Sequence, residues 1–171
     1  MQTKLEANFL SDFEQNQNIV HKVCRIYTTN NHAHKDLFQE ITIQLWKAYP
    51  KFRGDSKFST WMYRVALNTA ISLYRKSTRQ IRTQDISDVA YKIKSVDYDD
   101  TEEEQLKTLY KAIRRLNDID KALIFLYLED KPYKEISVTL GITEVNARVK
   151  MTRAKERTIS LEGRKNSFLF R

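Results

Sequence analysis

The sequence predicts an all-α protein with two small helical domains joined by a linker. The chain has 171 residues, a length that fits one domain or two small ones, and 41% of them are hydrophobic. Apolar residues recur mostly at spacings of three and four, which is typical of helices with one buried face. Only three glycines and two prolines are present, so β-hairpins would lack the turns they need.

The first domain, residues 1–77, is predicted to hold four helical stretches. A pair of amphipathic stretches is expected within residues 3–28, with Phe9 and Val23 among the inward positions. The polar segment TTNNHAH then breaks the pattern, and Asn31 or a near neighbour is expected to cap the next helix.

The third and fourth stretches surround a turn. An apolar stripe predicts a helix over residues 34–49, and Pro50 ends it because proline lacks the backbone donor. Gly54 supplies the turn, and the last stretch is expected from about Phe58 to Lys76. Its cap candidates are Asp55 and Ser56.

Residues 78–104 are predicted to form a linker that is acidic toward its end. The periodic pattern weakens there, and YDDTEEEQ at 98–105 is densely charged. Thr101 and Glu104 have the spacing of a capping box, so the same acidic residues can also favour the start of a helix over about 101–116. Both interpretations can hold at once.

The second domain, residues 105–163, is predicted to end in a helix-turn-helix. After a break at 117–120 and a short helix, the segment from Tyr133 to Arg157 forms two helices joined by a tight turn at Gly141. The second of these helices carries a row of cations, as expected of a helix that enters a DNA major groove. A tail of residues 164–171 follows.

Charge is distributed unevenly along the chain. Residues 1–82 carry 13 Lys and Arg against 6 Asp and Glu, residues 83–110 carry 3 against 8, and residues 111–171 carry 14 against 8. Two basic lobes therefore flank an acidic connector. This arrangement suggests a polyanionic partner bound at two places, although surface cations also serve solubility.

Several other functions are disfavoured by the composition. No run of about 18 apolar residues and no signal peptide is visible, so a cytoplasmic protein is expected. The single cysteine, Cys24, cannot form an internal disulfide or a multi-cysteine zinc site, and we expect it to be a half-buried core thiol. His21 is a lone helical histidine and His32 and His34 lie in a loop, so neither a metal nor a cofactor is expected.

Two segments carry a family resemblance. Residues 36–76 contain FRGDSKFSTW followed, after the single residue Met62, by YRVALNTA, and they resemble conserved region 2 of bacterial extracytoplasmic-function sigma factors, a group of the sigma-70 family. Residues 116–157, from LNDID to AKER, resemble region 4 of the same proteins. The first motif is highly specific, whereas a helix-turn-helix is shared with many regulators. The family has no separate middle domain, and the short connector leaves no room for one.

The resemblance implies a subunit that directs RNA polymerase to promoters, not a catalyst. In the family, region 2 binds the clamp helices of the largest catalytic subunit of core polymerase and helps to separate the strands at the −10 element. A helix face that mixes carboxylates with apolar residues suits a protein partner. The positions that match the core contact are Asp36, Gln39, Glu40, Trp46 and Lys47.

Residues 52–76 supply what strand opening requires. Unstacked bases need aromatic surfaces, polar groups for their edges and cations for the backbone. In the family, an asparagine that matches Asn68 helps to hold a flipped −10 base. Most of the aromatic residues are nevertheless expected to be core, since Trp61 and Tyr63 cannot both face DNA. The expected −10 contacts are Arg53, Lys57, Ser59, Thr60, Trp61, Arg64, Asn68, Arg75 and Lys76.

In region 4 the family places the second helix of the helix-turn-helix in the −35 major groove. Arginine can pair with guanine through two hydrogen bonds, and a threonine methyl can meet a thymine methyl. The expected base-facing or nearby phosphate positions are Arg148, Val149, Thr152 and Arg153, and the expected phosphate contacts are Lys134, Lys150, Lys155 and Arg157. Val145 replaces a common small residue, and RVK replaces a common KSR, so the promoter sequence does not follow from the family.

The partners implied are core RNA polymerase, including the flap of its second-largest subunit, promoter DNA and an anti-sigma factor. Three alternatives stay open on the residues alone. The chain could be a two-domain helix-turn-helix regulator that acts without polymerase, an enzyme acting on nucleic acid, or a structural adaptor.

Overall fold

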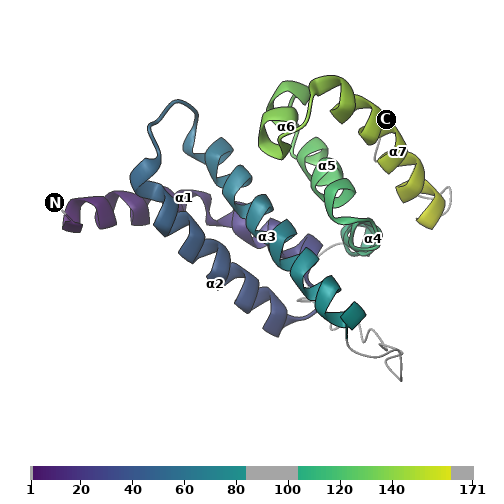
Figure 1. Cartoon of the computed structure of the whole chain (residues 1–171), viewed down its shortest axis with the longest axis horizontal. Coiled ribbons are helices and arrows are strands. Elements are labelled where there is room, and N and C mark those ends of the chain that lie inside the picture. The colour runs from purple at the N-terminus through teal and green to yellow at the C-terminus, as the bar shows by residue number, and fades with distance from the viewer. Residues whose placement is uncertain (1, 84–103, 163–171) are drawn as a thin grey trace. The chain divides into compact units, whose positions relative to one another are not determined.

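The computed structural model describes residues 2–83 and 104–162, and within them every regular element is a helix (Figure 1). This confirms the all-α prediction. The chain divides into two compact units, Met1–Tyr98 and Asp99–Arg171. No helix in the described part of the chain is long and apolar enough to cross a membrane.

The first unit is built from three long helices and one short turn. They are α1 (Gln2–Tyr27), α2 (Asn31–Ala48), the 3-10 turn η1 (Tyr49–Lys51) and α3 (Phe58–Thr83). Each of the three helices packs against the other two. Their shared core is formed by side chains with no measurable exposure, among them Val20, Val23, Ile26, Ile41, Leu45, Met62 and Leu67. Burial of each such side chain stabilises the fold by about 1.5–3 kcal/mol.

The prediction of two helical stretches within residues 3–28 was wrong, because α1 is continuous. The polar run between its apolar positions contains no glycine or proline, so nothing stops the helix. α3 likewise runs past the expected end at Lys76 to Thr83.

One local prediction in this unit is confirmed and another changes by a small amount. Asn30, a near neighbour of Asn31, caps α2, and its Oδ1 accepts a hydrogen bond from the Ala33 N–H at 2.8 Å. Cys24 is fully buried, not half-buried, and burial raises the pKa of its thiol to about 12.

The second unit holds four described helices, one of which lies at the centre and packs against the other three. They are α4 (Glu104–Arg114), α5 (Asp118–Leu128), α6 (Tyr133–Leu140) and α7 (Glu144–Glu162). α5 packs against the other three, and its residues from Asp120 to Leu126 are all buried. A helix that is covered on all sides must be apolar nearly all round, as α5 is.

A break was predicted at 117–120, but α5 already begins at Asp118. Asn117 ends the preceding turn and caps the helix, since its Oδ1 accepts a hydrogen bond from the Asp120 N–H at 2.9 Å. Asp118 and Asp120 then place carboxylates in the first turn, where the positive end of the helix dipole favours them.

The predicted capping residue Thr101 lies outside the described residues. The same holds for most of the predicted linker and for the predicted tail.

Candidate nucleic-acid interface

The turn between α6 and α7 is set by backbone geometry at Gly141. This residue has φ 66° and ψ 34°, the left-handed region that glycine adopts without strain. Its N–H and that of Ile142, the latter at 3.1 Å, both donate to the Ser137 carbonyl, which closes the end of α6. Thr143 then caps α7, because its Oγ1 accepts a hydrogen bond from the Asn146 N–H at 3.2 Å. The predicted helix-turn-helix is confirmed.

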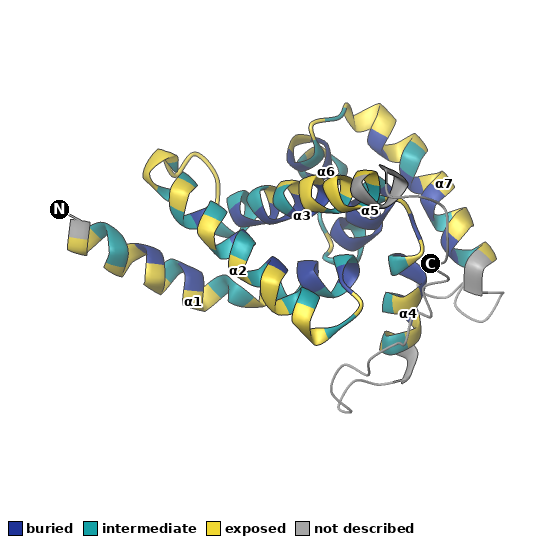
Figure 2. Ribbon diagram, turned by 60° about the horizontal axis from the view of Figure 1, so that its bottom comes forward, coloured by how far each residue is buried: buried dark blue, intermediate teal, exposed yellow. Residues whose placement is uncertain are grey.

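α7 has a buried side and an outward side (Figure 2). Its buried residues are Ala147, Met151, Ala154 and Thr158, which repeat at the helical spacing of three and four. The four residues predicted to face DNA bases or adjacent phosphates, Arg148, Val149, Thr152 and Arg153, are all exposed on the other side. Of the predicted phosphate contacts, Lys134 on α6 is exposed and Lys150 is half-buried.

Arg148 is held by two neighbours, Glu144 and Tyr133, neither of which was predicted as a site residue. Its Nη2 lies 2.7 Å from Oε1 of Glu144, one turn earlier on α7. Its guanidinium carbon lies 4.4 Å from the ring centre of Tyr133 on α6, a cation–π contact. The spacing of four between Glu144 and Arg148 was a visible signal for the ion pair, whereas the contact with Tyr133 depends on how α6 and α7 pack.

Two of the predicted phosphate contacts have partners inside the unit. The ammonium of Lys155 lies 3.7 Å from the ring centre of Tyr127 on α5. Arg157 forms an ion pair with the buried carboxylate of Asp120, so one of its nitrogens is already bonded. The side chains of Lys155 and Arg157 are therefore held by contacts within the unit, which the row of cations in the sequence did not indicate.

Exposed apolar side chains accompany the cations of the helix-turn-helix. Val145 is 72% exposed, Val138 on α6 is 58% exposed and the predicted Val149 is 46% exposed. Val145 and Val149 lie one turn apart on α7, so they share a face. Exposed methyl groups on such a helix can meet thymine methyls, which makes Val145 a further candidate reader. The exposure of Val145 could have been predicted from the sequence, because it precedes Ala147 by two residues and two residues along a helix point to nearly opposite sides.

In the first unit, four aromatic residues gather around the loop before α3. Tyr49, Phe52, Phe58 and Trp61 have ring centres 5.1 to 6.3 Å apart. Trp61 is half-buried in this cluster, and Tyr63 is only 5% exposed. Tyr63 is therefore part of the core, whereas Trp61 and the other three members of the cluster are half-buried. The cluster fixes the loop that carries the exposed Arg53 and Lys57.

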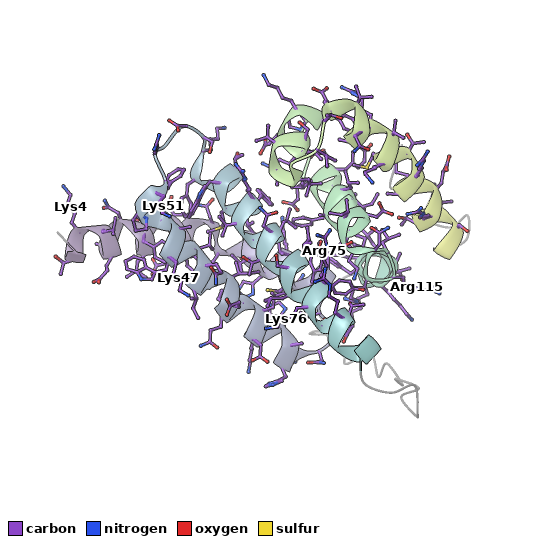
Figure 3. The ribbon with its side chains drawn as sticks, viewed as in Figure 1. Lys4, Lys47, Lys51, Arg75, Lys76 and Arg115 are labelled. Atoms are coloured by element: carbon purple, nitrogen blue, oxygen red, sulfur yellow. The ribbon has the colours of Figure 1, made fainter. Side chains whose placement is uncertain are left out.

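The predicted −10 residues on α3 fall largely on one face. Arg64, Asn68 and Arg75 are exposed and spaced by four and seven residues, so they form an outward stripe. Figure 3 shows Arg75 on this helix. Ser59 and Thr60, in its first turn, are half-buried.

Lys76 lies elsewhere on α3. It lines a groove of about 530 Å³ together with Asp36 and Glu40 of α2 and with Leu73. The structure thus brings a predicted −10 residue to two predicted polymerase contacts. Lys76 is separated from the outward stripe that contains Arg75 because successive residues of a helix are rotated by about 100°.

The predicted polymerase contacts on α2 also share an outward face. Asp36, Gln39 and Lys47 are exposed, and Glu40 is half-buried with its Oε1 accepting a hydrogen bond from Gln44 at 2.8 Å. Ile43, 38% exposed, lies among them and was missed, although it follows Gln39 and Glu40 at the helical spacing.

Trp46 differs from the other predicted polymerase contacts. Its ring meets Phe9 of α1 edge-on at 5.1 Å, so this tryptophan is partly structural.

No group of three metal-ligating side chains is gathered anywhere in residues 2–83 or 104–162. Two predictions about the histidines were wrong, because His32 and His34 lie on α2 and not in a loop, and His21 is not alone: its Nδ1 lies 3.1 Å from Nε2 of His34 across α1 and α2. Burial lowers the pKa of both rings, and the nearby Arg25 adds to the effect.

A helix-turn-helix unit joined in sequence to a second basic helical unit defines a DNA-binding transcription factor. Two family models that match the chain then specify the kind of transcription factor. The sigma-70 region 2 family model matches residues 13–80, and the sigma-70 region 4 family model matches residues 106–157. The chain belongs to the sigma-70 family, in its extracytoplasmic-function group.

Individual relatives agree with this assignment. The sigma-E factor of Haemophilus influenzae is 28% identical over 151 residues, which cover 82% of this chain and 79% of that protein. The sigma-E factor of Escherichia coli K12 is 27% identical over 132 residues, which cover 71% and 69%.

Solved structures share the fold at low sequence identity. The sigma factor RpoE of Bartonella quintana, solved with the anti-sigma factor NepR, has a TM-score of 0.72 and 18% identity, covering 90% of this chain and 96% of that one. CnrH, solved with the cytosolic domain of CnrY, has a TM-score of 0.65 and 16% identity, covering 94% and 91%.

Proposed function

We propose that this sigma factor binds core RNA polymerase and directs it to promoters through contacts with the −10 and −35 elements. The observation that supports this most is the exposed face of α7, where Arg148, Val149, Thr152 and Arg153 follow a turn set by Gly141. A helix with a polar and methyl-bearing outward face, entering from such a turn, suits the major groove.

In this proposal the first unit acts at the −10 element. Asn68 lies between Arg64 and Arg75 on the outward stripe of α3, so one amide group is flanked by two cations. The cations would hold the backbone of the separated strand, and the amide would bond to a base edge. Half-buried Trp61 offers a stacking surface at the edge of the aromatic cluster.

The outward face of α2 would bind core polymerase. It combines the carboxylates of Asp36 and Glu40, the exposed Ile43 and the cation Lys47, a mixture that suits a protein surface better than a nucleic acid. We assign this face to the clamp helices of the largest catalytic subunit, and the second unit to the flap of the second-largest subunit.

An anti-sigma factor is a further proposed partner. The structural relative RpoE of Bartonella quintana was solved with the anti-sigma factor NepR bound, and CnrH was solved with the cytosolic domain of CnrY. Because a polymerase subunit acts on the chromosome, the proposal implies a cytoplasmic location. The proposal also implies no catalytic role, because the subunit only binds polymerase and promoter DNA.

Run-off transcription tests the proposal. Promoters are first found by mapping transcript starts after overexpression, and purified protein is then added to core polymerase on those templates. We expect initiation at the mapped starts only when both components are present. A protein that binds the duplex tightly by itself but gives no initiation with core polymerase would instead be a helix-turn-helix regulator.

A further inference from the structure

One hydrogen bond joins α1 to the aromatic cluster of the first unit. The Tyr49 hydroxyl donates to Oδ2 of Asp12 at 2.7 Å, although the two residues are 37 positions apart in the sequence. Both residues are half-buried. Figure 3 labels Lys47 and Lys51, which flank Tyr49 in sequence where α2 ends. Neither Asp12 nor Tyr49 was predicted as a site residue.

The ring of Tyr49 contacts both α1 and the aromatic residues around the loop before α3. Its centre lies 6.3 Å from that of Phe52, 6.0 Å from that of Phe58 and 6.3 Å from that of Trp61. On the α1 side it meets Phe9 edge-on at 5.2 Å. The position of this one ring therefore affects every other member of the cluster.

Hydrogen bonds at both ends hold Tyr49 in one orientation. Burial, the bond to Asp12 and the charge of that carboxylate raise the pKa of Tyr49 to about 12, so the hydroxyl stays protonated and able to donate at neutral pH. The Tyr49 carbonyl accepts from the Phe52 N–H at 2.9 Å. Ring contacts allow a range of tilts, whereas a hydrogen bond requires a defined distance and angle. The bond to Asp12 therefore restricts the tilt of the Tyr49 ring.

We propose that Asp12 is a positioning residue for the −10 element, which orients Tyr49 and through it the surface that Trp61 offers to an unpaired base. This inference rests on the proposed function. Asp12 lies on α1, outside the residues expected to contact DNA, so it acts through Tyr49. A stacking surface that is fixed before DNA binds has less conformational freedom to lose, and such surfaces depend on hydrogen bonds from the residues behind them.

The test uses Tyr49→Phe and Asp12→Ala, which each remove the hydrogen bond and keep the aromatic ring. Binding of holoenzyme to a single-stranded oligonucleotide with the −10 sequence of a mapped promoter is measured. Each variant should bind about fivefold or more weakly than the wild type, because stacking on an aromatic side chain contributes strongly to such binding. The double variant should bind no more weakly than either single variant, since both changes remove the same interaction.

The conservative variant Asp12→Asn keeps an oxygen that can accept from the Tyr49 hydroxyl. It should therefore bind the oligonucleotide as the wild type does. All of these variants should bind core polymerase and the −35 duplex with unchanged affinity, because the aromatic cluster belongs to neither of those contacts.

Cys24→Ala is the control for a loss of stability. Cys24 is fully buried on α1 and is not a predicted contact, so this variant should lower the melting temperature by leaving a cavity and should bind the oligonucleotide normally. Equal losses of binding in Cys24→Ala and Tyr49→Phe would overturn the inference, and so would an Asp12→Asn variant that binds as weakly as Asp12→Ala. A wild-type holoenzyme that binds the −10 oligonucleotide no better than a scrambled one would instead contradict the proposed function, and the inference with it.

Discussion

At the residue scale, the cations of α7 differ in what they already contact. Lys155 and Arg157 have partners on α5, while Arg148 is held at the outward surface by Glu144 and Tyr133. An exposed ion pair contributes little to stability, about 0–1 kcal/mol. We therefore interpret Glu144 and Tyr133 as positioning residues, which keep the Arg148 guanidinium oriented and also keep a carboxylate near any incoming phosphate.

The variant Glu144→Gln tests this interpretation. Without the carboxylate, Arg148 is less fixed and repulsion of phosphate is lost, so binding to unrelated DNA should tighten and discrimination at the −35 element should fall by about fivefold or more. Competition binding of holoenzyme with natural and altered promoters measures both effects.

Asp130→Asn is the matched control for this prediction, because it also removes one negative charge but lies outside α7. Asp130 has φ 54°, a conformation that asparagine tolerates. Discrimination that is equal in the two variants would show that Glu144 does not position Arg148.

Lys121 provides a second prediction at the residue scale. The residue is 2% exposed on α5, and burial lowers its pKa to about 8, with Arg114 adding to the shift and Asp118 opposing it. Between pH 8 and 10.5 the unfolded chain binds more protons than the folded one, so stability rises with pH across that window. Below about pH 8 the whole cost of burying the charge is present.

Lys121→Met should remove this cost. At pH 7 we expect the free energy of unfolding to increase by about 1–3 kcal/mol, and the gain should shrink as the pH approaches 10.5. Denaturant unfolding at several pH values measures it. A destabilised variant at pH 7 would mean that the contacts of the ammonium outweigh its burial.

At the scale of elements, the helix-turn-helix depends on the conformation of one residue. A Cβ at Gly141 would meet no atom within 4 Å, so only the left-handed backbone opposes substitution. Gly141→Ala should cost about 1–2 kcal/mol and Gly141→Asn less, since asparagine tolerates this region. Thermal unfolding of the two variants checks the order. Equal losses would point to a cause other than backbone strain.

α1 and α2 are joined by the histidine pair, which predicts a dependence on pH. His21 and His34 both have lowered pKa values, so the folded state keeps them neutral while the unfolded chain takes up protons near pH 6.5. The contribution of the two neutral histidines to the free energy of unfolding should therefore be complete above pH 6.5 and be lost as the pH decreases below it. Melting temperatures at pH 7.5 and 5.5 should differ more for the wild type than for His34→Gln. An equal dependence in both proteins would assign the effect to other groups.

Sequence patterns predicted elements better than the contacts between them. The faces of α2, α3 and α7 follow from helical spacing, and the Gly141 turn follows from residue type. The continuity of α1 was missed, because apolar spacing fades in its polar middle while nothing there ends a helix. The contact of Arg148 with Tyr133 and the groove that brings Lys76 to Asp36 and Glu40 arise from packing between helices, which no local pattern encodes.

At the scale of the whole molecule, we propose that the two basic units bind two promoter elements. The family models match both units in the order that sigma factors require. Each unit presents its own outward face, with Asn68 on α3 and Arg148 on α7. We therefore expect substitutions in the two units to have separable effects on one promoter.

Permanganate footprinting of the holoenzyme on a mapped promoter tests this claim most directly, because permanganate reacts with unpaired thymines. With wild-type protein, thymines near the start site should become reactive and the −35 region should be protected from nuclease. The variant Asn68→Ala should lose the reactive thymines but keep the upstream protection. The variant Arg148→Ala should show weaker protection of the −35 region, because its binding free energy for that element should be less favourable by about 1–3 kcal/mol. Identical footprints for the two variants, or a wild-type holoenzyme that opens no DNA, would contradict the account.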